Sequence, residues 1–288
     1  MPYKSVLRDG IFADKNMLVT GGGSGIGRCN AHELASLGAM VTLIGRKEEK
    51  LKHVCDEIRE DGGLADYQVC DIRDEQQVIE TVQAIVAQKQ RIDGLVNNAG
   101  GQFPAMLADI SQKGWETVVR TNLTGGFMMA REVYKQSMRD HGGAIVNILA
   151  DMWGGMPGMG HSGAARSGMD NFTKTAAYEW ACSGVRVNAV APGWIISSGM
   201  DTYPPEMLPI IQSMQGAIPQ KRMGREAEVS SVICFLLTEG AAFVNGATLR
   251  IDGAASLGSA IIPLADHNNS KPYEGFHREI MPEIAKKL

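Results

Sequence analysis

The chain has 288 residues, 44% of them hydrophobic and 21% charged, and its 28 basic and 32 acidic side chains give a formal net charge of −4. This composition excludes a disordered chain, and the slightly acidic balance excludes a broad basic surface for nucleic acid or an anionic membrane. We therefore expect neither partner. The five cysteines contain no CxxC pair, which argues against a disulfide framework and against a metal site.

Targeting features are sparse in the sequence. No run approaches the ~20 apolar residues that span a bilayer, and the start, MPYKSVLRDGIF, lacks the apolar core of a signal peptide. The end, AKKL, only approaches the peroxisomal signal SKL, because a lysine replaces the small residue. We expect a cytoplasmic protein, with a peroxisomal location as the alternative.

Short apolar runs alternate along the chain with longer segments in which apolar residues recur every three or four positions. The runs are NMLVT, AMVTLIG, ADYQVC, DGLVNN, GAIVNIL, VRVNAVAP and TLRID. Strands separated by helices form parallel sheets, and right-handed crossovers place the helices on both faces. The sequence therefore predicts a single α/β domain over residues 1–288, with a Rossmann-type, doubly wound parallel sheet of about seven strands.

A glycine-rich turn, TGGGSGIGR, follows the first predicted strand and opens the next helix. Gly21, Gly25 and Gly27 are the glycines that we expect to matter, together with Ser24 and Ile26 of the same turn. Without a Cβ, these glycines permit a sharp turn and let backbone N–H groups approach a pyrophosphate. The turn between a strand and a helix predicts dinucleotide binding.

The second predicted strand ends at Arg46 and Lys47, where an NAD-binding protein usually carries an acidic residue for the ribose 2′-hydroxyl. Two cations at this place suit a 2′-phosphate, which Arg can hold with its planar fork. The alternative is that both residues only begin a solvated helix, RKEEKLKH. We predict NADP(H) as the cofactor, with NAD(H) less favoured.

Polar and small residues follow two further strands. The third predicted strand closes with Asp71 and Ile72, and the fourth closes with Asn98, Ala99 and Gly100. Open α/β sheets bind ligands at the carboxyl ends of their strands, so we expect Asp71 near the adenine and the second group near the adjoining ribose. Such residues also make ordinary turns, and only their combination indicates a cofactor groove.

Two segments interrupt the alternation of strands and helices, residues 197–222 and residues 259–288. The first is rich in methionine and proline and predicts a substrate lid, because a long loop in a compact domain is usually functional or disordered. The second predicts a C-terminal extension. Met200, Met207 and Met214 would give a lid an adaptable apolar surface, although filling a core is the commoner use of methionine and is the interpretation we favour.

Six motifs in one order resemble the short-chain dehydrogenase/reductase family: TGGGSGIGR, CDIRD, NNAG, TNLTG, APG and IDG. The resemblance covers residues 14–258 and implies cofactor contacts at Pro192, Gly193 and Ile195 as well. More narrowly, NNAGGQF, HSGAARSGMDNFTK and EWACSGVRVN resemble the peroxisomal trans-2-enoyl-CoA reductase and 2,4-dienoyl-CoA reductase branch, which reduces acyl-CoA double bonds with NADPH. The resemblance thus implies a small-molecule substrate such as an acyl-CoA. It also implies a homo-oligomer, a tetramer, that pairs through helices at residues 125–141 and 162–182.

Most family members use an Asn, a Ser, a Tyr and, four residues later, a Lys for catalysis. Asn122 matches the first, but Ala150, Ser162 and Arg166 stand at the other three places. A Ser hydroxyl lacks the phenolic pKa of ~10 and exchanges protons poorly near neutrality. Arg166 can bind ribose hydroxyls, yet its pKa of more than ~12 prevents it from relaying protons. Alcohol oxidation by the tyrosine mechanism is therefore not expected.

Three residues are candidates to replace the tyrosine. Asp170 lies where the enoyl-CoA reductase resemblance puts its own Tyr, Asp151 lies close to the proton donor of a dienoyl-CoA reductase resemblance, and His161 titrates in the right range. Arg166 and Lys174 lie one helical turn on either side of Asp170, so ion pairs with both are the favoured interpretation of this carboxylate. Asp151 has no cation close in sequence and is the freer acid, whereas a lone His is more often structural.

Conjugate reduction tolerates the loss of the tyrosine better than carbonyl reduction does. Charge develops on a thioester oxygen, and a weak acid or water can protonate the α-carbon. Ser162, Asn122 and the amide of Gln102 are candidate donors to that oxygen. We therefore predict an NADP(H)-dependent reductase of an enoyl-CoA-like thioester. The alternatives are a dehydrogenase of a hydroxyacyl or terpenoid alcohol that uses Asp151, and a cofactor-binding subunit without catalysis.

Overall fold

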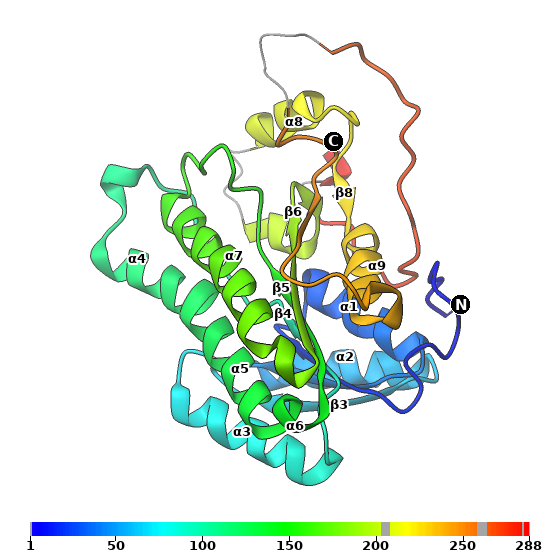
Figure 1. Cartoon of the computed structure of the whole chain (residues 1–288). Coiled ribbons are helices and arrows are strands. Elements are labelled where there is room, and N and C mark those ends of the chain that lie inside the picture. Colours follow the sequence, from blue (N-terminus) through cyan, green and yellow to red (C-terminus); the bar gives the residue numbers. More distant parts are fainter. Residues whose placement is uncertain (1, 203–207, 258–263, 284, 288) are drawn as a thin grey trace.

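The computed structural model describes residues 2–202, 208–257, 264–283 and 285–287. Seven parallel strands form one sheet in the order β3-β2-β1-β4-β5-β6-β9, and a separate parallel pair joins β7 to β8. Helices lie on both sides of the large sheet (Figure 1), which confirms the predicted doubly wound, Rossmann-type fold.

The strands are β1 (Asn16–Thr20), β2 (Met40–Gly45), β3 (Leu64–Val69), β4 (Gly94–Asn97), β5 (Gly143–Ile148), β6 (Val185–Pro192), β7 (Ile195–Ile196), β8 (Gly224–Arg225) and β9 (Thr248–Ile251). The helices are α1 (Gly25–Ser36), α2 (Glu48–Glu60), α3 (Glu75–Lys89), α4 (Gln112–Val119), α5 (Gly125–Val133), α6 (Arg139–His141), α7 (Gly160–Trp180), α8 (Leu208–Ala217) and α9 (Glu226–Leu237).

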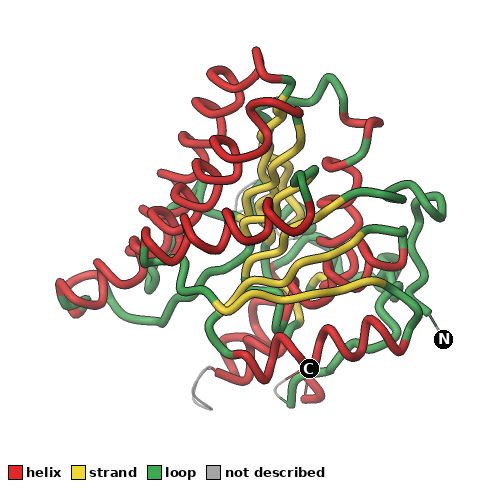
Figure 2. The backbone as a smooth tube through the Cα atoms, turned by 90° about the horizontal axis from the view of Figure 1, so that it is seen from below, coloured by secondary structure: helices red, strands yellow, loops and turns green. Residues whose placement is uncertain are grey.

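The sheet divides the hydrophobic core into two layers, and the view from below in Figure 2 shows helices on both sides of the strands. Successive side chains of a strand point to opposite faces, so Val19 joins the cluster that contains Leu34 of α1, whereas its neighbour Leu18 joins the cluster that contains Val82 of α3. α1, α2 and α9 supply the first cluster, and α3, α5 and α7 supply the second. Burial on both faces explains why the strands read as continuous apolar runs.

The position of β1 in the sheet determines where a ligand can bind. β1 lies between β2 and β4, so the chain leaves the sheet in opposite directions after β1 and after β4. Ligands of open α/β sheets bind at such a switch point, beside the carboxyl ends of the strands. The glycine turn follows β1 and residues 98–101 follow β4, so the topology brings these two predicted cofactor segments together.

A long helical segment that begins with α4 contains two π-helical turns. The first, Arg120–Thr124, links α4 to α5 and contains Asn122, and the second, Tyr134–Met138, links α5 to α6. Such turns often occur at functional sites. The helix predicted at residues 125–141 is therefore continuous but not uniformly α-helical. Within the described ranges, no helix is both long and apolar enough to cross a membrane.

The predicted lid folds partly into a small core of its own. Met200 is buried together with Ile211 of α8, Ile218 and Met223. This burial confirms the favoured interpretation for Met200, which fills a core. Met207 lies outside the described residues. The role of this segment as a lid stays a prediction.

The described part of the predicted C-terminal extension runs along the surface toward the N-terminus (Figure 1). Its Phe276 ring is buried, and the Arg28 guanidinium of α1 lies 5.0 Å from the ring centroid. Arg278 donates to the Asp61 carboxylate at 2.9 Å. These contacts attach the extension to α1 and to the end of α2.

Candidate cofactor and substrate groove

The glycine turn forms a tight cradle at the end of β1. Gly21 and Gly25 have φ values of +67° and +59°, a region that side chains with a Cβ rarely adopt. A Cβ on Gly27 would lie 2.5 Å from the Gly21 carbonyl oxygen and would also collide with the Asn98 amide. The predicted glycines therefore occupy places that favour glycine, and α1 begins at Gly25 itself, so the backbone N–H groups of its first turn belong to the same cradle.

Asn98 fastens the loop after β4 to this cradle. Its Nδ2 donates to the carbonyl oxygens of Thr20 at 3.0 Å and of Gly21 at 3.3 Å. The Thr20 hydroxyl in turn accepts hydrogen bonds from the backbone N–H groups of Asn98 and Ala99, at 3.0 and 2.9 Å. Asn98 thus holds the two halves of the switch point together, a role that its place at a strand end did not indicate.

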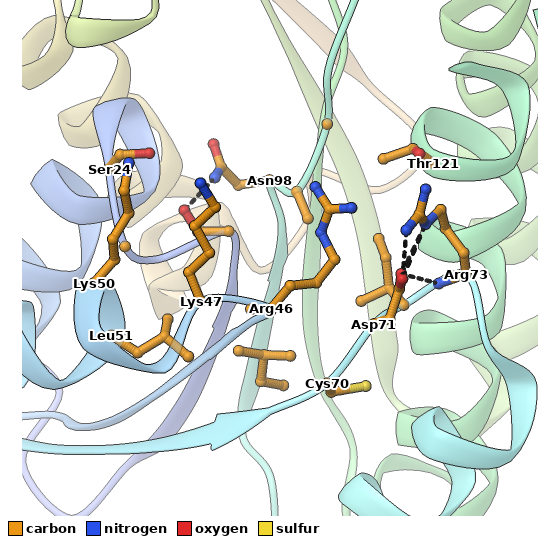
Figure 3. A pocket seen from close by; sticks show the side chains of 17 residues that line it. Ser24, Arg46, Lys47, Lys50, Leu51, Cys70, Asp71, Arg73, Asn98 and Thr121 are labelled. Atoms are coloured by element: carbon orange, nitrogen blue, oxygen red, sulfur yellow. Dashed lines mark hydrogen bonds and ion pairs between the residues drawn. The ribbon is translucent and has the colours of Figure 1, made fainter. Parts of the chain in front are cut away.

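A cavity of about 330 Å³ opens between the glycine turn and the ends of β2 and β3. Arg46 and Lys47 line it, and so does Lys50 of α2 (Figure 3). None of the three forms an ion pair with any described residue. Sequence reasoning missed Lys50, although its position three residues after Lys47 places both on one side of a helix. This cationic cavity fits a cofactor phosphate.

Asp71 and Ile72 line the same cavity beyond β3. Arg73 donates to both Asp71 carboxylate oxygens (Figure 3), and this hydrogen bonding lowers the pKa of Asp71 below its ordinary value. Asp71 is therefore ionised and held in one orientation. Ile72 is mostly buried against Gly125, so little of its side chain is open to a ligand.

A second cavity, of about 550 Å³, continues the groove past the NNAG loop. Asn98 and Gly100 border both cavities, so the two form one groove along the carboxyl ends of the strands. The second cavity brings together most of the remaining predicted residues, which come from α1, from the loop after β5, from α7 and from residues 192–195. Those in its lining are Ile26, Asp151, Arg166, Pro192, Gly193 and Ile195.

Arg166 lines the second cavity. Its Nη1 donates to the Ile148 carbonyl oxygen at 2.5 Å, its Nη2 lies beside Gly100, and its buried Nε has no hydrogen-bond partner in the described part of the chain. Burial lowers the pKa of Arg166 to about 10, which leaves it charged at neutral pH. The predicted ion pair with Asp170 is absent from the described structure because the guanidinium turns toward β5 instead. Its unpartnered Nε fits a residue that holds a bound group.

Ser162 and Asn122 both act on the loop after β4. The Ser162 side chain is fully buried and donates to Oε1 of Gln102 at 2.6 Å. Asn122 accepts from the Gly101 N–H at 2.9 Å and donates to the Gly101 carbonyl at 3.0 Å. Gln102 and Gly101 line the second cavity, whereas Ser162 and Asn122 lie behind them.

The three candidate acids lie in different surroundings. Asp151 lines the second cavity, and burial together with the nearby Asp252 carboxylate raises its pKa above the ordinary value. His161 is fully buried beside Phe103, with Nδ1 accepting from the Ser162 N–H and with Nε2 unpartnered within the described structure.

Asp170 does not line either part of the groove. It pairs with Lys174 at 2.5 Å and accepts from the Thr248 hydroxyl at 2.6 Å. Burial raises its pKa, but these hydrogen bonds outweigh burial, so the pKa of Asp170 is lowered. One of its two predicted ion pairs is thus confirmed. The described residues contain no cluster of His, Cys, Asp and Glu side chains that could hold a metal.

The sheet order, the glycine turn and the groove at the switch point define a Rossmann-type α/β protein. A family model described as enoyl-(acyl carrier protein) reductase matches residues 21–256. The chain belongs to the short-chain dehydrogenase/reductase family, and the relatives that show this membership are oxidoreductases.

Three known proteins illustrate this relationship. A 3-oxoacyl-[acyl-carrier-protein] reductase of Staphylococcus epidermidis is 33% identical over 242 residues, 83% of this chain and 98% of that protein. A probable 2,4-dienoyl-CoA reductase of Bacillus subtilis is 32% identical over 243 residues, 83% and 95% of the two chains. A solved structure described as a citronellol catabolism dehydrogenase of Pseudomonas aeruginosa PAO1 is 60% identical, covers 88% of this chain and 100% of its own, and has a TM-score of 0.81. These relatives support the family without selecting the narrower enoyl-CoA reductase branch.

Proposed function

We propose that the chain is an NADP(H)-dependent oxidoreductase that reduces the C=C bond of an enoyl-CoA-like thioester. The cofactor choice is supported by Arg46, Lys47 and Lys50, which surround one cavity without ion-pair partners among the described residues. Unpaired cations favour a 2′-phosphate, and Arg can hold it with two parallel hydrogen bonds. The glycine cradle and the α1 N-terminus would hold the pyrophosphate, and Arg166 the nicotinamide ribose.

One observation supports this choice of reaction: the hydroxyl of Ser162, which stands in place of the family tyrosine, is buried and hydrogen-bonded to Gln102. Reduction of a carbonyl delivers a proton to oxygen, for which the family uses a phenol, and Ser162 is a poor substitute. Reduction of a conjugated C=C bond instead needs hydrogen-bond donors at the thioester oxygen. Gln102 supplies an amide there, because Oε1 accepts from Ser162 and Nε2 is left as a donor.

The residues of the second cavity fit the steps of this reaction. A reduced nicotinamide bound in the groove would supply a hydride to the β-carbon. The C=C electron pair moves toward the thioester, where Gln102 Nε2 donates to the oxygen as it becomes an enolate. When the enolate collapses, the α-carbon takes a proton from the Asp151 carboxyl or from water. Burial and Asp252 raise the Asp151 pKa, which favours the protonated acid that this step requires.

A second candidate is the oxidation of a terpenoid or hydroxyacyl alcohol with Asp151 as the base. It is favoured by the 60% identity to a protein described as a citronellol catabolism dehydrogenase. In this reaction the Asp151 carboxylate would accept the alcohol proton, and a bound oxidised nicotinamide would accept the carbinol hydride. The same raised pKa makes Asp151 a stronger base than an ordinary carboxylate.

Calorimetry with NADPH and NADP⁺, followed by nicotinamide absorbance assays, separates these functions. NADPH oxidation with an enoyl-CoA, and no NADP⁺ reduction with citronellol or a 3-hydroxyacyl-CoA, is the expected result. Oxidation of an alcohol that disappears in Asp151→Asn would replace the proposal by the second candidate. Tight NADPH binding without turnover of any substrate would indicate a cofactor-binding subunit.

We also propose that the protein forms a homotetramer through the helices at residues 125–141 and 162–182. This is supported by exposed aromatic side chains on both of them, Phe127 and Tyr178. Obligate interfaces of this kind bury ~2,000 Å² or more. Light scattering at micromolar concentration should give four times the chain mass, and a stable monomer would refute the assembly.

A further inference from the structure

Exposed apolar side chains gather beside the second cavity. Phe103, Met106 and Leu107 follow the NNAG loop, and Trp153 follows β5. We call these four residues the apolar rim. Met106 and Leu107 are 68% and 66% exposed, although exposed side chains of this size cost free energy in water.

The rim is held in place by contacts between its two loops. The Ala105 N–H donates to the Gly158 carbonyl oxygen at 2.8 Å, and the Leu107 side chain lies against Gly160. Phe103 meets His161 edge to face, with ring centroids 4.5 Å apart. Gly158 lies between Pro157 and Met159, which both line the second cavity, so the rim continues the cavity wall outward.

The inner wall of the second cavity is also largely apolar. Three of its lining residues are methionines, Met156, Met159 and Met200, and flexible thioethers adapt to irregular or branched shapes. Arg166 is the only cation among the described residues that line this cavity, and its guanidinium is directed at β5 and the NNAG loop. Arg250 lies near the rim, but it stacks on the Trp153 ring at 4.0 Å. The phosphates of a carrier such as CoA therefore find no free cation among the described residues of this lining.

We infer that the protein recognises the apolar hydrocarbon chain of its substrate directly. The reactive end lies beside Gln102, and the chain passes the methionines and leaves over the apolar rim. The inference deepens the proposed function and rests on it in taking the second cavity as the substrate side and Gln102 as the contact of the reactive end. The inference predicts that substrate affinity increases with the length of the hydrocarbon chain and does not require a CoA group.

Calorimetry on the NADP⁺-loaded protein tests this with saturated straight-chain carboxamides, which have no C=C bond to reduce and no alcohol to oxidise. Affinity should rise roughly fourfold for each added methylene, because each one removed from water contributes ~0.8 kcal/mol. The matching saturated acyl-CoA esters should show the same dependence on chain length. Constant affinity along the carboxamide series, or binding of the CoA esters alone, would overturn the inference.

Variants of the apolar rim test where the outer end of the substrate's hydrocarbon chain lies. Met106→Asp and Leu107→Asp should abolish the gain from the outermost methylenes while the shortest amide binds as before. Val6→Asp is the matched control, because Val6 is 68% exposed in the N-terminal segment, and NADPH affinity verifies that each variant is folded.

Equal losses in the control would contradict the inference. So would a change of mass in light scattering of the rim variants, which would show that a second copy covers the rim. Failure of NADPH turnover with an intact chain-length dependence would reject the proposed reaction and leave this inference standing.

Discussion

The Ser162 hydroxyl donates to Oε1 of Gln102, with 2.6 Å between the two oxygens. Ser162 is fully buried, whereas Gln102 is exposed and lines the second cavity. Ser162, which stands at the place of the family tyrosine, therefore does not line the cavity itself, whereas its hydrogen-bond partner Gln102 does. Gln102 is thus the residue that can contact a substrate, and Ser162 is the residue that positions Gln102.

Gln102→Glu should lower kcat by roughly 100- to 1,000-fold if the amide donates to the enolate oxygen, because one such donor supplies ~2.7–4 kcal/mol. Ser162→Ala should cost less, about fivefold, since a neutral hydrogen bond contributes ~1 kcal/mol. Ser162→Thr should restore the rate because it keeps the hydroxyl. Steady-state kinetics at saturating NADPH measure all three. An unchanged kcat in Gln102→Glu would remove the amide from the mechanism.

Arg46→Asp should weaken NADPH binding roughly 10- to 100-fold and NADH binding far less, because it replaces a charge-assisted hydrogen bond of ~1.5–3 kcal/mol with repulsion of the 2′-phosphate. Lys52→Asp is the matched control, since Lys52 is exposed on α2 outside the cavity. Calorimetry with both dinucleotides measures the difference. Equal losses for NADPH and NADH would reject the NADP assignment.

Gly27→Ala should destabilise the cradle by ~1–3 kcal/mol, because the added methyl group overlaps the Gly21 carbonyl and the Asn98 amide. NADPH affinity should fall with it. Gly216→Ala in α8 is the control: its methyl group would meet no atom within 4 Å, so it should leave stability unchanged or raise it slightly. Urea unfolding and calorimetry check both variants, and normal NADPH affinity in Gly27→Ala would show that the cradle is looser than the structure indicates.

Asp170→Asn should lower the melting temperature and leave kcat unchanged, because the carboxylate lies outside the groove and pairs with Lys174 and Thr248. The ion pair is partly exposed, so it contributes only ~0.3–0.5 kcal/mol. Lys174→Gln should reproduce the small thermal effect. A large loss of kcat in Asp170→Asn with unchanged melting would make this carboxylate the acid of the reaction.

We expect Glu226 to make the free energy of unfolding depend on pH. Burial and the neighbouring Glu279 carboxylate raise its pKa to about 8, although Arg28 acts in the opposite direction. As pH rises from about 4.5 to about 8, the unfolded chain releases this proton first, so this residue's contribution makes the folded state less stable, by ~1.4 kcal/mol for each pKa unit.

Glu226→Gln should therefore be more stable than the native protein near pH 8, and the advantage should vanish near pH 4.5. Urea unfolding across this range measures the difference between the two proteins. The exposed Glu239→Gln is the control and should show no such trend. A constant difference between Glu226→Gln and the native protein at all pH values would contradict the raised pKa.

Local sequence patterns were sufficient to predict the sheet, the glycine cradle and the cationic end of β2. Each depends on residues that are adjacent in the chain or repeat at a fixed spacing, such as Gly21, Gly25 and Gly27. Lys50 was missed because a lysine on a polar helix face looks like an ordinary solvated residue until the cavity is seen. The predicted ion pair between Arg166 and Asp170 was wrong because helical spacing allows a contact that burial against β5 removes.

The amino-acid sequence by itself determined that this is a doubly wound α/β protein with a dinucleotide turn and without the family's tyrosine, since periodicity, turn glycines and residue identity are local properties. Only the tertiary structure decided which side chains meet. Gln102 and Ser162 are 60 residues apart, and Asn98 and Thr20 are 78 apart, yet each pair is joined by a hydrogen bond. Parallel strands with crossover helices bring distant strand ends to one edge of the sheet, and burial then selects which polar groups must pair.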